Sequence, residues 1–327
     1  MAAAAVALLL VLVLSVRDWL TPVSDGERDA RVAAALAELG PGSQRADRRL
    51  PWPSVGQSSI TVVGAGHIGS TAKQRPIPIA SLAKVMTAAV LLRDHPMRSG
   101  DAGPTVTVDQ RAETEADSAD ESSAPVREGQ QLPLRRMLEL LLLPSANNVA
   151  RLLARWDAGS QEAFVRKMNR TAKTLGMTRT TYTGASGIEA TTVSTADDQG
   201  KLAAHAMRQP VLRAVVATRH TRVPGIAGTV RNTNRLLDHP GVVGLKTGSS
   251  TPAGGNLMWA ARIGTEGFSR SQELSRPRRS SPLVIGVVLG QRAGTSPAQA
   301  LEAAFAHSEA LLDALRKWLP TTLTEAR

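Results

Sequence analysis

Apolar runs that are interrupted by prolines predict the helices in the N-terminal half of this chain. Residues 79–92 are mostly apolar and follow Pro76 and Pro78, which favour an extended approach, so we expect a helix in this run whose first turn begins at Ser81. A second strongly apolar run covers residues 135–143, and a helical pattern resumes at residues 149–156. The short polar stretch between the last two runs is therefore expected to form a loop at a helix junction.

The C-terminal half combines strand patterns with one amphipathic helix. Residues 241–250 alternate β-branched residues before a group of small residues, which is typical of a strand. Residues 256–263 and 283–289 are also strand-like, and the arginine-containing segment 264–282 between them indicates a long hairpin loop. Residues 297–319 place leucines at helical spacing. Such a helix more often packs on a sheet than on a membrane.

A Ser-x-x-Lys pair, Ser81 and Lys84, stands at the start of the first predicted helix. Side chains three residues apart share a helix face, so this spacing places a primary amine beside a hydroxyl. A lysine takes a serine proton only if burial or a nearby cation lowers its pKa from about 10.4. The apolar neighbours supply burial, and Lys246 would supply the cation. Taken alone, the pair is more often a capping serine and an exposed lysine.

The second motif, Ser145-Ala146-Asn147, follows Pro144 at the predicted helix junction. A loop held between two helices is a suitable place to direct a hydroxyl and an amide into a cleft. An N-cap serine is an equally good explanation of this motif alone.

The third motif, Lys246-Thr247-Gly248, lies at the end of the predicted strand 241–250. Gly248 and its small neighbours leave room for another backbone to come close to the strand edge. A peptide could add to that edge as an extra strand, with main-chain hydrogen bonds that set its register.

In this order and spacing, the three motifs together resemble those of the penicillin-recognising serine hydrolases. More narrowly, the chain is similar to the low-molecular-mass D-alanyl-D-alanine carboxypeptidases, peptidase family S11. The resemblance covers roughly residues 50–320 and includes segments 168–177, 184–188 and 229–237. It implies a β-lactamase/transpeptidase-like α+β fold, with an antiparallel sheet flanked by helices, an all-helical lobe, and a cleft between them. It also implies catalysis without a metal or cofactor.

The resemblance assigns catalytic roles to three residues of this chain. Ser81 would attack the carbonyl of the penultimate D-alanine and become the acyl-ester, while Lys84 would accept its proton. Ser145 would relay a proton to the leaving amine, assisted by Lys246.

The same resemblance assigns substrate-binding roles to the second and third motifs. Asn147 would hold Lys84 and the substrate amide. Lys246 and Thr247 would bind the terminal carboxylate, and Gly248 belongs to the same binding strand. The backbone amides of Ser81 and Ser249 would form the oxyanion hole.

The function implied is removal of the terminal D-alanine from peptidoglycan stem pentapeptides, with β-lactams as acylating inhibitors. A D,D-endopeptidase or transpeptidase shares the acyl-enzyme and stays an alternative. A class A β-lactamase is disfavoured, because no acidic residue between Asn147 and Lys246 has a Glu-x-x-x-Asn context. A catalytically silent wall-binding relative is disfavoured by the intact reactive residues. Departures from the common pattern, at Leu82-Ala83, Asn148 and Gly184, remove no reactive group.

Composition narrows the choice of chemistry and partners. The 327 residues are 42% hydrophobic, enough for one large domain or two interleaved ones. The sequence has no cysteine, which excludes thiolate catalysis and disulfides, and its six histidines show no metal-ligand spacing. With three Phe, five Trp and one Tyr, stacking surfaces for nucleic acid are not expected despite the net charge of +11. Anionic wall polymers would attract that charge.

The ends of the chain predict the domain organisation. Residues 1–16 are almost wholly apolar, and we favour an N-terminal membrane anchor over residues 1–20, with a cleaved signal as the alternative and a cytosolic helix as a third option. A linker with one helix follows to residue 53, then a catalytic domain at 54–320 and a tail at 321–327. The enzyme is therefore expected outside the cytoplasm, anchored to the membrane or secreted to the wall.

An acidic segment at residues 101–128 separates the first two helical regions. It is expected to be an exposed loop beside the cleft whose acidic residues serve solvation.

Overall fold

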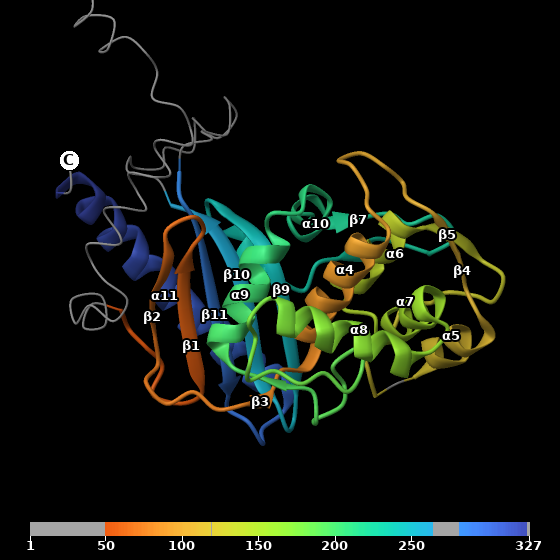
Figure 1. Cartoon of the computed structure of the whole chain (residues 1–327), viewed down its shortest axis with the longest axis horizontal. Coiled ribbons are helices and arrows are strands. Elements are labelled where there is room, and N and C mark those ends of the chain that lie inside the picture. The colour runs from red at the N-terminus through yellow and green to blue at the C-terminus, as the bar shows by residue number, and fades with distance from the viewer. Residues whose placement is uncertain (1–49, 119, 264–280, 326–327) are drawn as a thin grey trace, which may run out of the picture.

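A computed structural model describes residues 50–118, 120–263 and 281–325 (Figure 1). An antiparallel five-stranded sheet lies beside a helical lobe, and the strand order is β2-β1-β11-β10-β9. The strands are β1 (Gln57–Val62), β2 (Gly66–Ser70), β9 (Val242–Ser250), β10 (Gly254–Arg262) and β11 (Leu283–Gln291). Strand β9 is an edge of this sheet and faces the helical lobe, so it can contribute residues to a site between the two parts.

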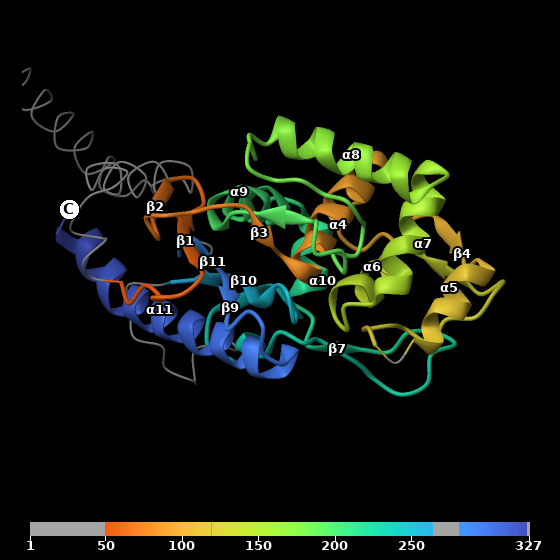
Figure 2. The same cartoon turned by 90° about the horizontal axis from the view of Figure 1, so that it is seen from below.

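Helices cover both faces of the sheet because its strands are apolar on both sides. Along β10, Leu257 and Trp259 belong to one buried cluster, and Met258 and Ala260 belong to another. This alternation is the two-residue period of a strand. The first cluster packs under α11 (Pro297–Glu325), and α9 (Ala196–Ala206) packs on the opposite face, as Figure 2 shows.

The helical lobe is built around α4 (Ala83–Asp94), whose residues from Ala83 to Leu92 are all buried. A helix that is apolar on every side belongs in a core, and α4 contacts α6, α7, α8 and α9. The other helices are α5 (Gln110–Thr114), α6 (Leu134–Leu142), α7 (Asn147–Ala158), α8 (Gln161–Thr174) and α10 (Pro210–Val216). Three short 3₁₀ helices are η1 (Ala80–Leu82), η2 (Glu115–Asp117) and η3 (Arg235–Asp238).

Three two-stranded ribbons complete the described structure. Their strands are β3 (Ile77–Pro78) with β6 (Val193–Ser194), β4 (Thr105–Thr107) with β5 (Gln131–Pro133), and β7 (His220–Thr221) with β8 (Val230–Arg231). The β3–β6 ribbon immediately precedes η1 and α4 along the chain, so it helps to fix where α4 begins.

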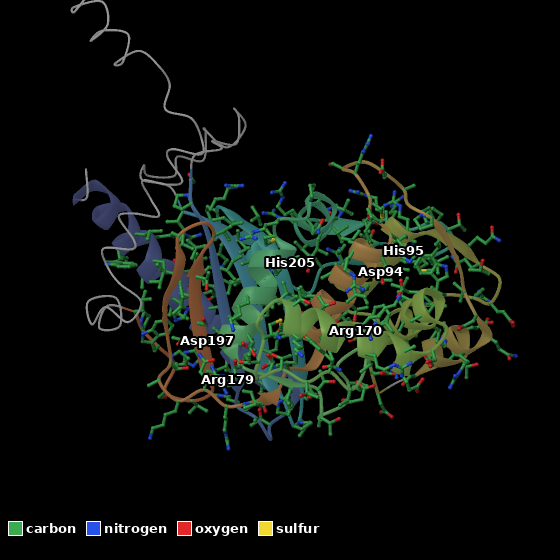
Figure 3. The ribbon with its side chains drawn as sticks, viewed as in Figure 1. Asp94, His95, Arg170, Arg179, Asp197 and His205 are labelled. Atoms are coloured by element: carbon green, nitrogen blue, oxygen red, sulfur yellow. The ribbon has the colours of Figure 1, made fainter. Side chains whose placement is uncertain are left out.

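A charged network holds the C-terminal end of α4 to its neighbours. Figure 3 shows Asp94 and His95 close together at this end. Lys167 of α8 donates to Asp94 at 2.9 Å and to the buried carboxylate of Asp157 at 2.6 Å, and Asp157 is also hydrogen-bonded to His95 at 2.9 Å. The network joins α4, α7 and α8 and makes the lobe a rigid support for the residues at the other end of α4.

The predicted architecture is confirmed, with shifted boundaries. The runs at 135–143, 241–250 and 297–319 correspond to α6, β9 and α11, and α11 continues to Glu325. Arg262 pairs with Leu283, so the two strands around the predicted hairpin loop are antiparallel neighbours. Most of that loop, residues 264–280, lies outside the described residues.

The first predicted helix starts later than expected. Ala80 has φ 47°, in the left-handed region, and a 3₁₀ turn precedes α4. Ser81 therefore lies in a tight turn, and Lys84 lies in the first turn of the α-helix.

The acidic segment 101–128 differs from expectation, because it is folded and some of its carboxylates are ion-paired. It contains β4, α5 and η2. Glu115 and Glu121 form ion pairs with Arg151 of α7 at 2.8 and 2.5 Å. Solvation is thus the wrong interpretation for these two carboxylates, which neutralise a mostly buried guanidinium.

The predicted anchor at residues 1–20 and the predicted helix in the linker lie outside the described residues. Within the described ranges, no helix is both long and apolar enough to cross a membrane. The domain boundaries stay predictions.

Candidate active site

Ser81 and Lys84 meet at the N-terminal end of α4. Lys84 Nζ and Ser81 Oγ are within hydrogen-bond distance at 2.8 Å, as the spacing of three residues predicts. Ser81 is partly exposed, whereas Lys84 is completely buried. The hydroxyl is therefore accessible from outside while the amine beside it is shielded from water.

Two further acceptors determine the direction of the Lys84 amine. Its Nζ donates to Asn147 Oδ1 at 2.5 Å and to the backbone carbonyl of Ser186 at 2.8 Å. A neutral amine has two protons and one lone pair. When both protons are held by these acceptors, the lone pair is left to face Ser81 Oγ. This arrangement suits a base that removes the serine proton.

Burial makes this base available at lower pH than an ordinary lysine. Burial is the main cause that lowers the pKa of Lys84 well below its usual value, and the Lys246 cation lowers it further. Burial also lowers the pKa of Lys246 to about 7. Both causes of the lowered Lys84 pKa were expected from its apolar neighbours and from the third motif, whereas the lowered pKa of Lys246 was not predicted.

Ser145 and Asn147 lie at the junction between α6 and α7. Ser145 has φ 70°, and α7 begins at Asn147. The structure brings the Asn147 carboxamide to Lys84. The buried hydroxyl of Ser145, in contrast, has no hydrogen-bond partner among the described residues. It is neither the N-cap acceptor of α7 nor bonded to Lys246, so its bonding capacity is unused.

Lys246, Thr247 and Gly248 lie consecutively on the edge strand β9, and all three are buried. Lys246 Nζ donates to the carbonyl of Thr247 at 2.9 Å. The Thr247 hydroxyl is hydrogen-bonded to that of Thr233 at 2.6 Å. Ser249 follows them and is partly exposed.

Gly248 allows a close approach, but by this chain's own backbone. A Cβ on Gly248 would lie 2.9 Å from the amide nitrogen of Ser81 and 3.1 Å from the carbonyl oxygen of Ile79. The glycine thus lets the Ser81 turn press against β9. Addition of a substrate strand to the β9 edge stays a prediction.

Sequence reasoning missed three contributors to the site. The Ser186 carbonyl binds Lys84 because Gly187 packs on the Ser81 turn: a Cβ on Gly187, with φ 81°, would lie 2.0 Å from the carbonyl oxygen of Ala80. Glu121 accepts from Asn147 Nδ2 at 2.6 Å, and Thr233 supports Thr247. In the sequence, only Gly187 could have indicated the Ser186 contact, because a backbone carbonyl can come from any type of residue.

Two departures from the common pattern have structural explanations. Asn148 is fully buried and binds the backbone of the acidic segment, because its Oδ1 accepts from Ala124 and its Nδ2 donates to Ala112 and Ala124. A Cβ on Gly184 would lie 2.0 Å from the Glu189 carboxylate, which occupies that space. Neither departure disturbs the contacts between Ser81 and Lys84.

The lowered pKa of Lys246 predicts how stability depends on pH. Below about pH 7 the folded and unfolded states both carry the proton, and folding bears the full burial penalty. Between about 7 and the ordinary value of about 10.4 the unfolded state binds more protons, so stability rises with pH. The difference in unfolding free energy between the wild type and Lys246→Met should grow by up to about 1.4 kcal/mol per pH unit in that window.

Urea unfolding at several pH values measures this difference, and Lys173→Met, which replaces an exposed lysine, is the matched control. A difference that is the same at every pH would mean that Lys246 titrates as an ordinary lysine.

Comparison with known proteins shows the family of this chain. The D-alanyl-D-alanine carboxypeptidase family, Peptidase_S11, matches residues 66–268. A D-alanyl-D-alanine endopeptidase of Pseudomonas aeruginosa is 33% identical over 196 residues, which are 57% of this chain and 60% of that protein. D-alanyl-D-alanine carboxypeptidase DacB2 of Mycobacterium tuberculosis is 34% identical over 193 residues, 57% of this chain and 63% of the relative. The chain thus spans about 60% of the length of these curated relatives.

The fold is similar to that of the Streptomyces K15 DD-transpeptidase. The two structures superpose with a TM-score of 0.66 at 25% identity, over 81% of this chain and 98% of the other. This similarity confirms the predicted α+β transpeptidase-like fold. Because the family match covers more than half of the sequence, the chain belongs to the D-alanyl-D-alanine carboxypeptidase family, peptidase family S11.

Proposed function

We propose that this protein is a serine D,D-carboxypeptidase that releases the terminal D-alanine of peptidoglycan stem pentapeptides through an acyl-enzyme on Ser81. The observation that carries the proposal is the position of the buried Lys84 amine, 2.8 Å from Ser81 Oγ and held by two other acceptors. Family membership supports the substrate class.

In the acylation step, Ser81 Oγ bonds to the carbonyl carbon of the penultimate D-alanine and its proton passes to Lys84. The tetrahedral intermediate then loses the terminal D-alanine as its C–N bond breaks. The leaving amine takes the proton that Lys84 accepted, passed on through the Ser145 hydroxyl, whose unused bonding capacity supports this role. The ester on Ser81 remains.

In the second step, a water molecule gives a proton to Lys84 and attacks the ester carbonyl. The C–O bond to Ser81 breaks, Ser81 regains its proton, and the shortened peptide leaves. Throughout, Lys246 and Thr247 would bind the substrate carboxylate, and the amides of Ser81 and Ser249 would stabilise the oxyanion. Gly248 packs closely on the Ser81 turn, which brings β9 next to Ser81 and supports this role for the two amides.

Benzylpenicillin tests the proposed nucleophile directly. Intact-protein mass spectrometry should show an acyl adduct that persists for minutes or longer, and peptide mapping should place it on Ser81. Loss of penicillin from solution without an adduct would instead indicate a β-lactamase. A folded protein with neither adduct nor turnover would indicate a catalytically silent relative.

An endopeptidase is the second candidate, since the Pseudomonas aeruginosa relative bears that name. Chromatography of products from a stem pentapeptide and from a cross-linked peptide dimer separates the two activities. Release of D-alanine from the pentapeptide supports the carboxypeptidase, and cleavage of the dimer alone supports the endopeptidase.

We also propose that the enzyme works outside the cytoplasmic membrane, held there by residues 1–20. Its net charge of +11 would favour contact with anionic wall polymers. A mature protein that lacks residues 1–20, as N-terminal sequencing would show, would contradict the anchor.

Gly248→Ala tests the contact between β9 and the Ser81 turn. The added methyl must displace backbone atoms 2.9 to 3.1 Å away, so we expect at least about tenfold slower acylation by penicillin and a loss of about 1–3 kcal/mol in unfolding free energy. The rate can be followed with a fluorescent penicillin.

Gly200→Ala is the matched control for this substitution. Gly200 lies within α9, and its added Cβ would be 3.5 Å from Thr61 Oγ1, an ordinary contact. This control should acylate at the wild-type rate. Wild-type acylation by Gly248→Ala would mean that the Ser81 turn does not depend on this contact.

A further inference from the structure

Glu121 touches the candidate site from the side opposite to Lys84. Its Oε2 accepts from Asn147 Nδ2 at 2.6 Å, while Asn147 Oδ1 accepts from Lys84. The Asn147 side chain is buried, so both ends of its carboxamide are used within the protein. A carboxylate, an amide and the candidate base therefore form one line that leads to Ser81.

Arg151 fixes the Glu121 carboxylate from the next turn of α7. Its Nη2 donates to Glu121 Oε1 at 2.5 Å and its Nη1 donates to Oε2 at 3.2 Å. Its Nε donates to Glu115 at 2.8 Å, which orients the guanidinium in turn. Paired contacts of this kind fix geometry as well as charge. Glu121 is thus held in place by groups that do not touch Lys84.

A carboxamide has two orientations that differ by exchange of its oxygen and nitrogen. In the observed orientation, Asn147 Oδ1 takes one proton of Lys84 and leaves the amine lone pair for Ser81. In the reversed orientation, Nδ2 would donate to that lone pair, and Oδ1 would face the Glu121 carboxylate. An ionised carboxylate only accepts hydrogen bonds, so the reversed orientation places two acceptors together.

We propose that Glu121 is a positioning residue that fixes the Asn147 carboxamide so that the Lys84 lone pair stays directed at Ser81. This inference rests on the proposed function, in which Lys84 takes the Ser81 proton. It assigns the acidic segment a role in orienting the base.

Glu121 also acts on Lys84 through its charge. Burial lowers the pKa of Lys84 most. The charged groups around Lys84 are Lys246 and Arg151, which lower its pKa, and Glu121 and Glu189, which raise it. Removing the Glu121 charge should lower the pKa of Lys84 further and leave Arg151 less neutralised, an effect of the same sign. The acidic limb of the acylation rate should therefore move to lower pH.

Two substitutions separate orientation from charge. Glu121→Gln keeps an oxygen that can accept from Asn147 but removes the charge, so we expect the acidic limb to move down by about half a pH unit or more, with the plateau rate largely kept. Glu121→Ala removes both, so we expect the same direction of shift and a plateau about tenfold lower. Asp120→Asn makes the same change in net charge at the neighbouring exposed position and should leave both quantities unchanged.

The measurement is the second-order rate of Ser81 acylation by a fluorescent penicillin from about pH 5 to about pH 9, normalised to the fraction of acylable protein. That normalisation removes misfolded protein from the comparison. If the wild type forms no adduct, the proposed function fails. If the wild type reacts, but Glu121→Gln keeps the wild-type limb and Glu121→Ala keeps the wild-type plateau, the role of Glu121 alone is overturned.

Discussion

Ser81→Ala should eliminate the penicillin adduct and lower the release of D-alanine by about 10⁴-fold or more. No other atom in the turn supplies a nucleophile, and the hydroxyl is the one group that Lys84 can deprotonate there. The variant should still fold, because the Oγ of Ser81 is bonded only to Lys84 among the described residues. Intact-protein mass spectrometry measures the adduct, and chromatography of the pentapeptide digest measures the hydrolysis.

Ser160→Ala is the control, because it should lower stability without affecting acylation. The Ser160 hydroxyl caps α8 by accepting from the amide of Ala163 at 3.1 Å. Its loss should lower the unfolding free energy by about 1 kcal/mol and leave acylation intact. An adduct on the Ser81→Ala protein, mapped to Ser145 for example, would show that the nucleophile was assigned wrongly.

The parts of the site that could be predicted are those encoded by local spacing. Ser81 and Lys84 are three residues apart, and a helical turn, whether 3₁₀ or α, brings side chains at that spacing together. Lys246 and Thr247 lie on a strand whose β-branched pattern is visible in the sequence. In these cases the neighbours that determine the position of a side chain are also its neighbours in the chain.

The parts that could not be predicted depend on distant segments. The Ser186 carbonyl reaches Lys84 from 102 residues away, and a backbone oxygen has no residue type to recognise. Glu121 lies in an acidic stretch whose composition predicts a solvated loop. Its partner Arg151 becomes its neighbour only when the segment folds against α7, so the sequence does not indicate the contact. The 3₁₀ turn at Ser81 was missed for a related reason: β3, β9 and Gly187 impose it from outside.

The buried amine of Lys84 gives the second large expected effect. Lys84→Met keeps an unbranched side chain of similar length but removes the base, so acylation of Ser81 should slow by about 10²–10⁴-fold. The reaction with penicillin should still end on Ser81, since the hydroxyl is present. Stopped-flow or manual quench with a fluorescent penicillin gives the rate, and peptide mapping gives the position.

The pH dependence of stability distinguishes a lost base from a damaged fold. Lys84→Met also leaves the acceptors on Asn147 and Ser186 without this donor, at about 1–3 kcal/mol each, so the change in stability at a single pH combines opposing effects. The slope does not. Because the folded pKa of Lys84 lies well below the unfolded value of about 10.4, the unfolded wild type binds more protons between those two values, and its stability rises with pH there.

The variant lacks this contribution, so its unfolding free energy should fall behind that of the wild type as the pH approaches about 10. Groups that do not interact with Lys84 cancel in the difference, and Lys173→Met, at an exposed position of α8, should show no such trend. Slow acylation with a constant difference in stability would mean that Lys84 is charged in the folded protein at neutral pH. A charged amine has no lone pair, so that result would remove Lys84 as the base and leave the deprotonation of Ser81 to another group.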